Sequence, residues 1–425
     1  MSGAGILHIS DLHFRPEDSA DALLGPLEED LAHLPIAPAF VVITGDFVDR
    51  GNVAAFPVAI EFLRGLQRAT RLPWDRFILC PGNHDVQPVD GLFVWKQRAG
   101  QHEEEVKREG EQVLVRLLDK YPERFAAFNA MYRTLLGCQL NPDLCRVHAY
   151  PEERLKFVVF NTNARIDEHR RSEAGADDGA VSRILRQANQ PAPARSPMRR
   201  FRRWFWGPDP ELRIAVWHHA VLGDWAMQGA EKGLAGRLAQ NSFGLVLHGD
   251  VHEFRAQVAN PFQNSLYVAG AGTLYAGDAA RPPSTGYFYN LLEVDPDFAF
   301  VRVHVREQTH RHGPFAPCNR FDEGSYYTLD RPRIIGQRRV GGWSRPDLRA
   351  SARVLLIAGV ASLGTGVFLE KYAPGQEPLS WVNWAWIFAI WACLIVAVYV
   401  AFAPRARART SAAPPPKARG TAAGR

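Results

Sequence analysis

Short apolar runs alternate with longer amphipathic stretches over the N-terminal part of the chain. The apolar runs are GILHIS, FVVIT and RFILC, and each is followed closely by an acidic, glycine or proline residue. Between them, residues 21–34 and 53–69 carry apolar side chains at helical spacing. This order predicts a β-α-β-α-β beginning, in which buried strands deliver polar residues at their carboxyl ends, where open α/β sheets build their sites.

The central part of the chain continues this alternation and predicts an α/β fold. Residues 97–137 have helical spacing and few helix breakers, which predicts a helical insertion over the site. Residues 167–210 are rich in glycine, proline, alanine and arginine and are predicted to form a basic loop. Further strands are predicted at 155–163, 212–219, 243–252 and 265–273, and an antiparallel pair at 287–295 and 298–307.

Two strongly apolar runs, 354–369 and 381–403, distinguish the C-terminal part of the chain. The second has the length of about 20 residues that crosses a bilayer, the first is shorter, and neither has the polar face of an amphipathic helix. Arginines flank both outer ends, which by the positive-inside rule places both ends of the pair in the cytoplasm. We therefore expect two transmembrane helices within 354–403; a pair of buried core helices is the alternative.

The remaining segments, the cysteines and the net charge bear on where the protein is located and on its partners. We expect a basic juxtamembrane linker at 326–353, a disordered basic tail at 404–425, and a body on the cytoplasmic face of the inner (plasma) membrane. The chain starts without the basic and long apolar segments of a signal peptide, and its five cysteines contain no CxxC pair, which favours a reduced compartment. The net charge of +5 is mild and says little about a nucleic-acid partner.

Clusters of polar residues follow five of the predicted strands. Divalent ions need oxygen or nitrogen ligands that converge from separate strands, and alternate residues of one strand point the same way, so Asp11 and His13 can hold one ion together. A single carboxylate can bridge two ions about 3.5–4 Å apart, which suits Asp46. The cluster residues are Asp11, His13, Asp46, Asn83, His84, Asp85, His218, His219, Asp250 and His252.

The ordered motifs D-x-H, G-D-x-x-D-R-G, G-N-H-D, H-H and G-x-x-H resemble those of the calcineurin-like metallophosphoesterase superfamily, and within it the bacterial cyclic-nucleotide-phosphodiesterase-like branch. The resemblance runs from Ile6 to about Phe321 and implies a catalytic domain at 1–325. It implies a two-sheet α/β sandwich flanked by helices, with a dinuclear metal site at the strand ends. It also implies hydrolysis of a phosphodiester, of nucleotide or cyclic-nucleotide type, by a metal-bridging hydroxide.

The resemblance also implies roles for individual residues. His84 would protonate the leaving group and Asp85 would orient it. The first metal would be held by Asp11, His13 and His252, the second by Asn83, His218 and Asp250, and Asp46 would bridge them. Three residues are candidates for substrate contact or support: Arg50, which could instead form a structural ion pair with Asp49; His219, the alternative to His218; and His248, in a supporting or substrate-rim position.

Asp250 departs from the family pattern G-H-x-H, because a carboxylate stands where an imidazole is expected. One interpretation is a working site in which manganese, iron or magnesium is favoured over zinc, since these harder ions prefer oxygen ligands. The other is a degenerate site that binds one metal or none. The proline of the branch's H-H-P motif is also replaced, by Ala220.

Other functions stay open at this point. The expected substrate is a phosphate ester, and the alternatives are a membrane-proximal lipid phosphoesterase or pyrophosphatase, a nuclease, and a membrane-tethered module that binds a ligand without turnover. The arginines of 195–203 are interpreted as a solvated or lipid-facing surface in preference to a nucleic-acid contact.

Overall fold

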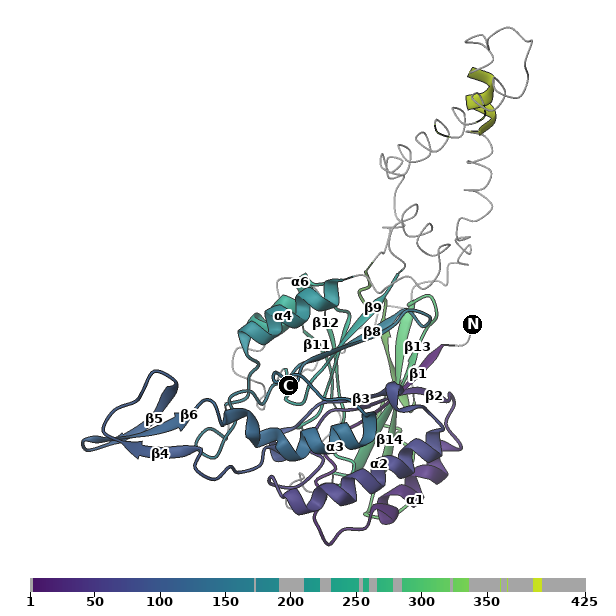
Figure 1. Ribbon diagram of the computed structural model, residues 1–425. Helices are drawn as coiled ribbons and strands as arrows, with labels where there is room; N and C mark the ends of the chain where they lie inside the picture. Colours follow the sequence, from purple (N-terminus) through teal and green to yellow (C-terminus); the bar gives the residue numbers. More distant parts are fainter. Residues whose placement is uncertain are drawn as a thin grey trace, which may run out of the picture. The chain divides into compact units, whose positions relative to one another are not determined.

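The computed structural model describes residues 3–171, 173–190, 210–221, 231–251, 255–259, 266–277, 285–321, 324–335, 360, 365 and 385–391. The chain divides into two units. The first comprises Met1–Arg200 and Gly207–Gln337, and the second comprises Phe201–Trp206 and Arg338–Arg425. Every described candidate site residue belongs to the first unit, which is a mixed α/β body (Figure 1).

The first sheet contains the predicted N-terminal strands. Its order is β15-β14-β13-β1-β2-β3, with β16 paired to β14. The parallel strands β1, β2 and β3 end in register, with Ile9 beside Ile43 and Ile43 beside Leu79, so the residues that follow them emerge at one edge. The strands are β1 (Ala4–Ile9), β2 (Pro38–Ile43), β3 (Phe77–Leu79), β13 (Tyr287–Val294), β14 (Phe300–Gln308), β15 (Ala316–Pro317) and β16 (Tyr326–Asp330).

The second sheet has the order β11-β12-β10-β9-β8-β7. Its central strands β8, β9, β10 and β12 are parallel, and they too deliver their carboxyl ends to one edge. Apolar side chains of both sheets, such as Phe40, Val42, Phe157 and Ile214, share one buried cluster. The strands are β7 (Arg146–Tyr150), β8 (Leu155–Val159), β9 (Leu212–Val216), β10 (Leu245–His248), β11 (Arg255–Ala259) and β12 (Leu266–Gly270).

Helices cover the outer faces of the two sheets (Figure 1). Helices α1 (Ala20–Leu31), α2 (Phe56–Thr70) and α3 (Ala126–Leu136) pack on the first sheet, where Leu27, Phe62 and Phe128 are buried. Helices α4 (Asp178–Asn189) and α6 (Gly236–Gln240) pack on the second. Single turns are η1 (Val53–Ala55), η2 (Trp74–Arg76), η3 (Asn83–Asp85), η4 (Tyr121–Phe125) and the π-turn η5 (Glu231–Ala235).

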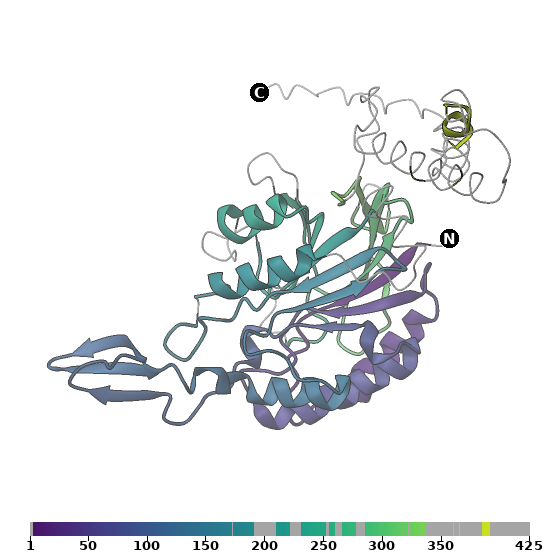
Figure 2. The ribbon, with the colours of Figure 1, turned by 45° about the horizontal axis from the view of Figure 1, so that its top comes forward.

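The insertion predicted to be helical is largely a small sheet. Strands β4 (Phe93–Lys96), β5 (Glu103–Glu109) and β6 (Gln112–Leu117) form a three-stranded antiparallel sheet, and only α3 confirms the expected helix. Gly110, with φ of +59°, makes the tight turn between β5 and β6, and β-branched Val113 and Val115 are buried. The turn residue therefore outweighed the apparent helical spacing. Figure 2 shows this sheet extending from the side of the body.

Two other predicted segments need correction or lie outside the described residues. The expected basic loop 167–210 contains α4, whose first turn is capped by the Asp177 carboxylate, an acceptor for the Ala180 N–H at 2.7 Å. Most of the expected hairpin 354–403, part of the linker 326–353 and all of the tail 404–425 lie outside the described residues. Among the residues that are described, no helix combines the length and apolar character that a membrane crossing requires.

Candidate metal centre

The loops after β1 and β2 are tied together at the edge of the first sheet. Asp11 and His13 follow β1, and Asp46 follows β2. The Asp11 N–H donates to the carbonyl of Gly45 (3.2 Å), and the His13 N–H donates to the carbonyl of Asp46 (2.9 Å). All three candidate side chains are buried. The sheet register thus converts residues far apart in sequence into one polar cluster.

The candidate ligands adopt strained backbone conformations. Asp11, His13, Asp46 and Asp250 have φ angles of 55°, 46°, 56° and 68°. A non-glycine residue in the left-handed region costs on the order of 1–3 kcal/mol and persists only where surrounding contacts impose it. Such strain gathers at functional sites, because folding for stability alone would avoid it.

Two glycines allow the loops to approach each other. A Cβ atom on Gly82 would lie 2.0 Å from Oδ1 of Asp46. Gly45 has φ of +94°, and a Cβ atom there would lie 2.8 Å from Nδ1 of His218. Glycine is therefore required at both positions for the polar side chains to converge.

Asp46 lies at the centre of the cluster. Its Oδ2 atom is 3.4 Å from Nε2 of His13 and 3.4 Å from Nε2 of His218. Its Oδ1 atom accepts the backbone N–H of His84 at 2.8 Å. Burial opposes ionisation, but the neighbouring imidazoles, His218 foremost, lower the pKa of Asp46 well below its usual range. Asp46 is thus a carboxylate shared by two imidazoles, as a bridging ligand must be.

His218 presents one ring nitrogen to a set of oxygen atoms. Its Nδ1 is 2.6 Å from the carbonyl oxygen of Thr44 and therefore carries a proton. Its Nε2 faces Oδ1 of Asn83 (2.8 Å), Oδ2 of Asp46 (3.4 Å) and Oδ1 of Asp250 (3.7 Å). A lone pair directed at several oxygens is repulsive unless a cation or a proton lies between them. Accordingly, the carboxylates overcome burial and raise the pKa of His218 well above its usual value.

His13 occupies the corresponding position on the other side of Asp46. Its Nε2 lies 3.6 Å from Oδ1 of Asp11, and its Nδ1 lies 3.8 Å from Oδ1 of Asp49. Burial alone would lower the pKa of His13, but the surrounding carboxylates, Asp11 and Asp49 first, raise it to about 10. The carboxylates therefore favour the protonated form of both imidazoles, those of His13 and His218.

The structure brings Asp250 to the His218 side of the cluster. Its backbone N–H donates to Oδ2 of Asp11 at 3.1 Å, which links the loop after β10 to the loop after β1. Burial raises the pKa of Asp250 to about 6, with Asp11 and Asp46 adding to the effect and His218 opposing it. His252, the remaining predicted ligand, lies outside the described residues.

Asp85 does not orient His84 as expected. Its Oδ1 accepts the N–H groups of Phe47 (2.8 Å) and Val48 (3.2 Å), and its Oδ2 accepts those of Asp46 (3.0 Å) and Gly82 (2.8 Å). Burial and the adjacent Asp46 carboxylate raise the pKa of Asp85 to about 7, while these N–H donors oppose the rise. Asp85 therefore organises the loops that carry the ligands.

The residue beside the His84 ring is Asp49, which the sequence interpretation treated only as a partner of Arg50. Oδ1 of Asp49 is 3.1 Å from Nδ1 of His84. Hydrogen bonding to His13, together with the charge of His84, holds the pKa of Asp49 below its usual range despite partial burial. The available signal was the second aspartate of GDFVDRG, which follows the bridging candidate Asp46 in the same loop.

The three candidates for substrate contact or support differ in position. Arg50 is exposed, with Nε 4.0 Å from Oδ1 of Asp49. His219 is buried, its Nδ1 lies 2.8 Å from Oγ1 of Thr162, and its ring centroid lies 5.0 Å from that of His218. His248 is also buried, with Nδ1 2.8 Å from the carbonyl oxygen of Gly249, and a place on a substrate rim is therefore wrong.

A cavity of about 690 Å³ lies beside His84. Asn83 and His84 form one wall, Phe93 of β4 contributes an aromatic ring, and Arg50 and Arg171 contribute cationic groups. This volume lies within the range of about 300–1,000 Å³ typical of ligand pockets. The cavity therefore has room for a substrate next to the polar cluster.

The donor atoms of the cluster fit divalent metal ions. One group comprises His13, Asp46 and His84, and a second comprises Asp11, Asp46 and His218. Both combine carboxylate oxygens with imidazole nitrogens and share Asp46, and the Nε2 of His218 is already directed at oxygens. The abundance of carboxylates suits manganese, iron or magnesium.

Comparison with known proteins gives the following matches. The family model described as Metallophos, Calcineurin-like phosphoesterase, matches residues 4–254. TT1561 of Thermus thermophilus is 13% identical, with a TM-score of 0.36, over 69% of this chain and 95% of that one. GAP50 of Plasmodium is 8% identical, with a TM-score of 0.38, over 83% and 95%. Vps29 of Chaetomium thermophilum is 10% identical, with a TM-score of 0.32, over 77% and 100%. No curated protein matches the chain.

Proposed function

Because the chain belongs to the calcineurin-like phosphoesterase family, we propose that it is a metal-dependent hydrolase of phosphodiesters of the nucleotide or cyclic-nucleotide type. The observation that carries this proposal is the position of Asp46, whose Oδ2 lies 3.4 Å from both His13 and His218. A carboxylate between two imidazoles is suited to bridge two divalent ions.

The proposed ligands belong to two sets that share Asp46. Asp11 and His13, together with His252 as the family pattern implies, would hold one ion, and Asn83, His218 and Asp250 would hold the other. Manganese, iron or magnesium would fit this oxygen-rich set better than zinc. Divalent ions, when bound, polarise phosphoryl oxygens and lower the pKa of water towards neutrality.

The chain itself supplies a proton donor. The His84 imidazole is 31% exposed and lines the cavity, while its Nδ1 accepts the Arg50 backbone N–H at 3.1 Å and lies 3.1 Å from Oδ1 of Asp49. This leaves the Nε2 side to deliver a proton to the departing oxygen of the substrate. Arg50, exposed at the same wall, would attract the phosphate group.

The test is hydrolysis by the purified full chain of bis(p-nitrophenyl) phosphate, compared with p-nitrophenyl phosphate as a monoester. We expect manganese-dependent turnover of the diester, its loss with a chelator, and its loss in Asp46→Asn. Exposed Asp75, at the other end of β3, provides the control Asp75→Asn. Metal binding without turnover of either ester would favour the ligand-binding module instead.

We also propose attachment to the inner (plasma) membrane, with the catalytic body and both termini in the cytoplasm. This proposal rests on the apolar run 381–403 and the flanking arginines alone. We expect the full chain to sediment with membranes and to resist extraction at high pH. Release of the full chain by salt would contradict a membrane-spanning anchor.

A further inference from the structure

The cavity beside His84 has a composition that the metal cluster does not explain. Its volume is about 690 Å³, and among the described residues Asp11, Asp46 and His218 do not line it. Its walls come from the loop before β4, from Phe93, and from residues 166–171. A space bounded mostly by loops outside the metal cluster is a place for the part of the substrate that does not react.

The chemistry proposed above decides which part of the substrate enters this cavity. His84 lines it and is the proposed donor of a proton to the departing oxygen. A departing group that takes a proton from His84 would therefore extend from His84 into the cavity. The cavity is thus a leaving-group pocket, and this conclusion rests on the proposed function.

The cavity combines an aromatic face with cationic groups. The Phe93 ring lies edge-on to His169 at 4.5 Å between centroids, and the Arg116 guanidinium lies over it at 5.6 Å, so its orientation is fixed and a base has one face of the ring to stack on. Arg171 is exposed on the rim, and within the described part of the chain no carboxylate comes within ion-pairing distance of it. An aromatic ring and a guanidinium are the groups that bind a base and a phosphate.

Other charges in the walls are already matched. Asp167 is buried and ion-paired with Arg116 of β6, and Arg124 donates to the carbonyl oxygens of Tyr121, Ala164 and Ile166. The exposed rim carboxylate Glu168 lies 3.6 Å from Nε2 of His169, a contact that is an ion pair only when the imidazole is protonated. Among the described residues, Arg171 is therefore the rim cation left for a ligand, whereas Arg50 lies 4.0 Å from Asp49.

The insertion is fastened to the opposite wall. Arg116 of β6, 1% exposed, also bonds Glu104 of β5 at 2.5 Å, and Glu104 in turn bonds Arg170 at 2.9 Å. These ion pairs connect the three-stranded sheet with residues 166–171, which form the other side of the cavity. The pocket is consequently held in shape before a substrate arrives.

From these observations we propose that the cavity selects a leaving group made of a nucleoside that carries a further phosphate. The base stacks on Phe93, and the extra phosphate is bound by Arg171. The substrate is then a dinucleotide or a short oligonucleotide end with a terminal phosphate. A diester with a small uncharged leaving group uses only part of this pocket.

The experiment compares the manganese-loaded full chain on adenylyl-adenosine without a terminal phosphate and on the two forms that carry it at the 5′ or 3′ end. We expect at least one phosphorylated form to have a higher kcat/KM. Because Arg171 is exposed, the expected preference is about threefold to tenfold. Arg171→Ala should remove this preference, and Arg171→Lys should retain part of it.

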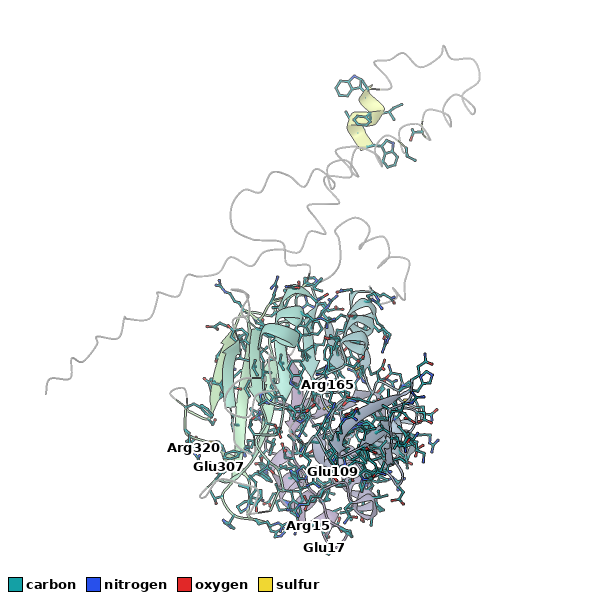
Figure 3. All side chains as sticks on the ribbon, turned by 90° about the vertical axis from the view of Figure 1, so that its left-hand side faces the viewer. Arg15, Glu17, Glu109, Arg165, Glu307 and Arg320 are labelled. Carbon is teal, nitrogen blue, oxygen red and sulfur yellow. The ribbon has the colours of Figure 1, made fainter. Side chains whose placement is uncertain are left out.

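The control is Arg165→Ala. Arg165, labelled in Figure 3, is exposed on the same segment but does not line the cavity. This variant should keep the preference for the phosphorylated substrate. A second measurement is inhibition of turnover by adenosine monophosphate. Phe93→Leu, which keeps an apolar side chain in β4, should raise the inhibition constant of this nucleotide by about tenfold, because the base loses its stacking partner.

The possible outcomes distinguish the leaving-group pocket from the proposed function. If the wild type hydrolyses bis(p-nitrophenyl) phosphate but has no preference for a terminal phosphate, the leaving-group pocket is overturned and the proposed function stands. If no diester is hydrolysed, the proposed function fails. Calorimetric binding of adenosine monophosphate, weakened in Arg171→Ala and unchanged in Arg165→Ala, would then support the pocket alone, and equal binding to all three proteins would overturn it.

Discussion

The Nδ1 atom of His84 lies 3.1 Å from Oδ1 of Asp49, and the same carboxylate group lies 3.2 Å from Nε of Arg15 through its Oδ2 atom. The contact joins η3, which follows β3, to the loop that follows β2. The Arg50 backbone N–H also donates to this Nδ1 atom at 3.1 Å, so both contacts hold one side of the imidazole and the other side is available to the cavity. The pair therefore gives the proposed proton donor a defined orientation.

Asp49→Asn should lower turnover most for diesters whose leaving group is a poor one. The amide keeps the size of the side chain but removes the carboxylate that faces Nδ1 of His84 and helps to orient the ring for proton delivery. We expect a loss of about tenfold to 100-fold in kcat for a dinucleotide, and a much smaller loss for bis(p-nitrophenyl) phosphate, whose nitrophenolate departs without a proton. Steady-state kinetics on both substrates measures the difference.

A companion variant for this prediction is His84→Asn. If His84 is the donor, this variant should show the same dependence on the leaving group, with a larger loss of about 100-fold or more for the dinucleotide. Equal losses on both substrates in either variant would mean that Asp49 and His84 serve only to hold metal or structure.

Metal binding should release protons from the cluster. His13 has a pKa raised to about 10 and His218 has a pKa well above its usual value, so both are protonated at pH 8 in the absence of metal. A bound ion replaces these protons, and the apparent affinity should rise as the pH rises from 7 towards 10. Calorimetry at pH 8 in buffers of different ionisation enthalpy should show release of about one proton per imidazole. A pH-independent affinity would contradict the ligand roles of both residues.

Much of the architecture could be predicted because strand ends are visible in the sequence. Apolar runs such as GILHIS and FVVIT are stable only when they are buried in the core. The polar residues that follow them then lie together where the parallel strands end. The family motifs pointed to Asp11, His13 and Asp46, which the sheet register brings together.

The roles of neighbouring residues were less predictable. Asp85 and Asp49 each stand close to a candidate catalytic residue in sequence, and only the fold decides which carboxylate reaches the His84 ring. Likewise, the rings of consecutive His218 and His219 lie only 5.0 Å apart between centroids, and tertiary contacts decide their roles: Nε2 of His218 faces Oδ2 of Asp46, whereas Nδ1 of His219 lies 2.8 Å from Oγ1 of Thr162. Such choices depend on tertiary contacts, which local patterns do not carry.

The insertion was mispredicted for a local reason. Its charged residues are compatible with either an α-helix or an antiparallel β-ribbon, and their spacing alone does not distinguish the two structures. Gly110, with its positive φ, and the β-branched residues Val113 and Val115 favour the ribbon. A glycine between two such charged stretches was the signal for a hairpin.

Asp85→Asn should destabilise the fold. Asp85 is fully buried and accepts backbone N–H groups with both oxygens, so an amide would place its own N–H₂ against at least one of these donors. We expect a loss of about 2–4 kcal/mol in the free energy of unfolding. Denaturant unfolding of the metal-free protein measures it, with Asp75→Asn as the control. A loss of activity at unchanged stability would instead restore a direct catalytic role for Asp85.

Asp250 is the test of whether the departure from the family pattern changes or abolishes the second metal position. Its Oδ1 lies 3.7 Å from Nε2 of His218, near enough for both groups to bind one ion. Asp250→Ala should therefore reduce the bound metal by one ion per chain and lower diester turnover by about 100-fold. Asp250→His should keep the metal content and shift the preference from manganese towards zinc, because an imidazole replaces a hard oxygen ligand. If metal content and turnover are unchanged in Asp250→Ala, the Asp250 carboxylate is not a metal ligand. The negative charge of Asp250 beside Asp11 and Asp46 in the native protein would then have to be balanced by another cation.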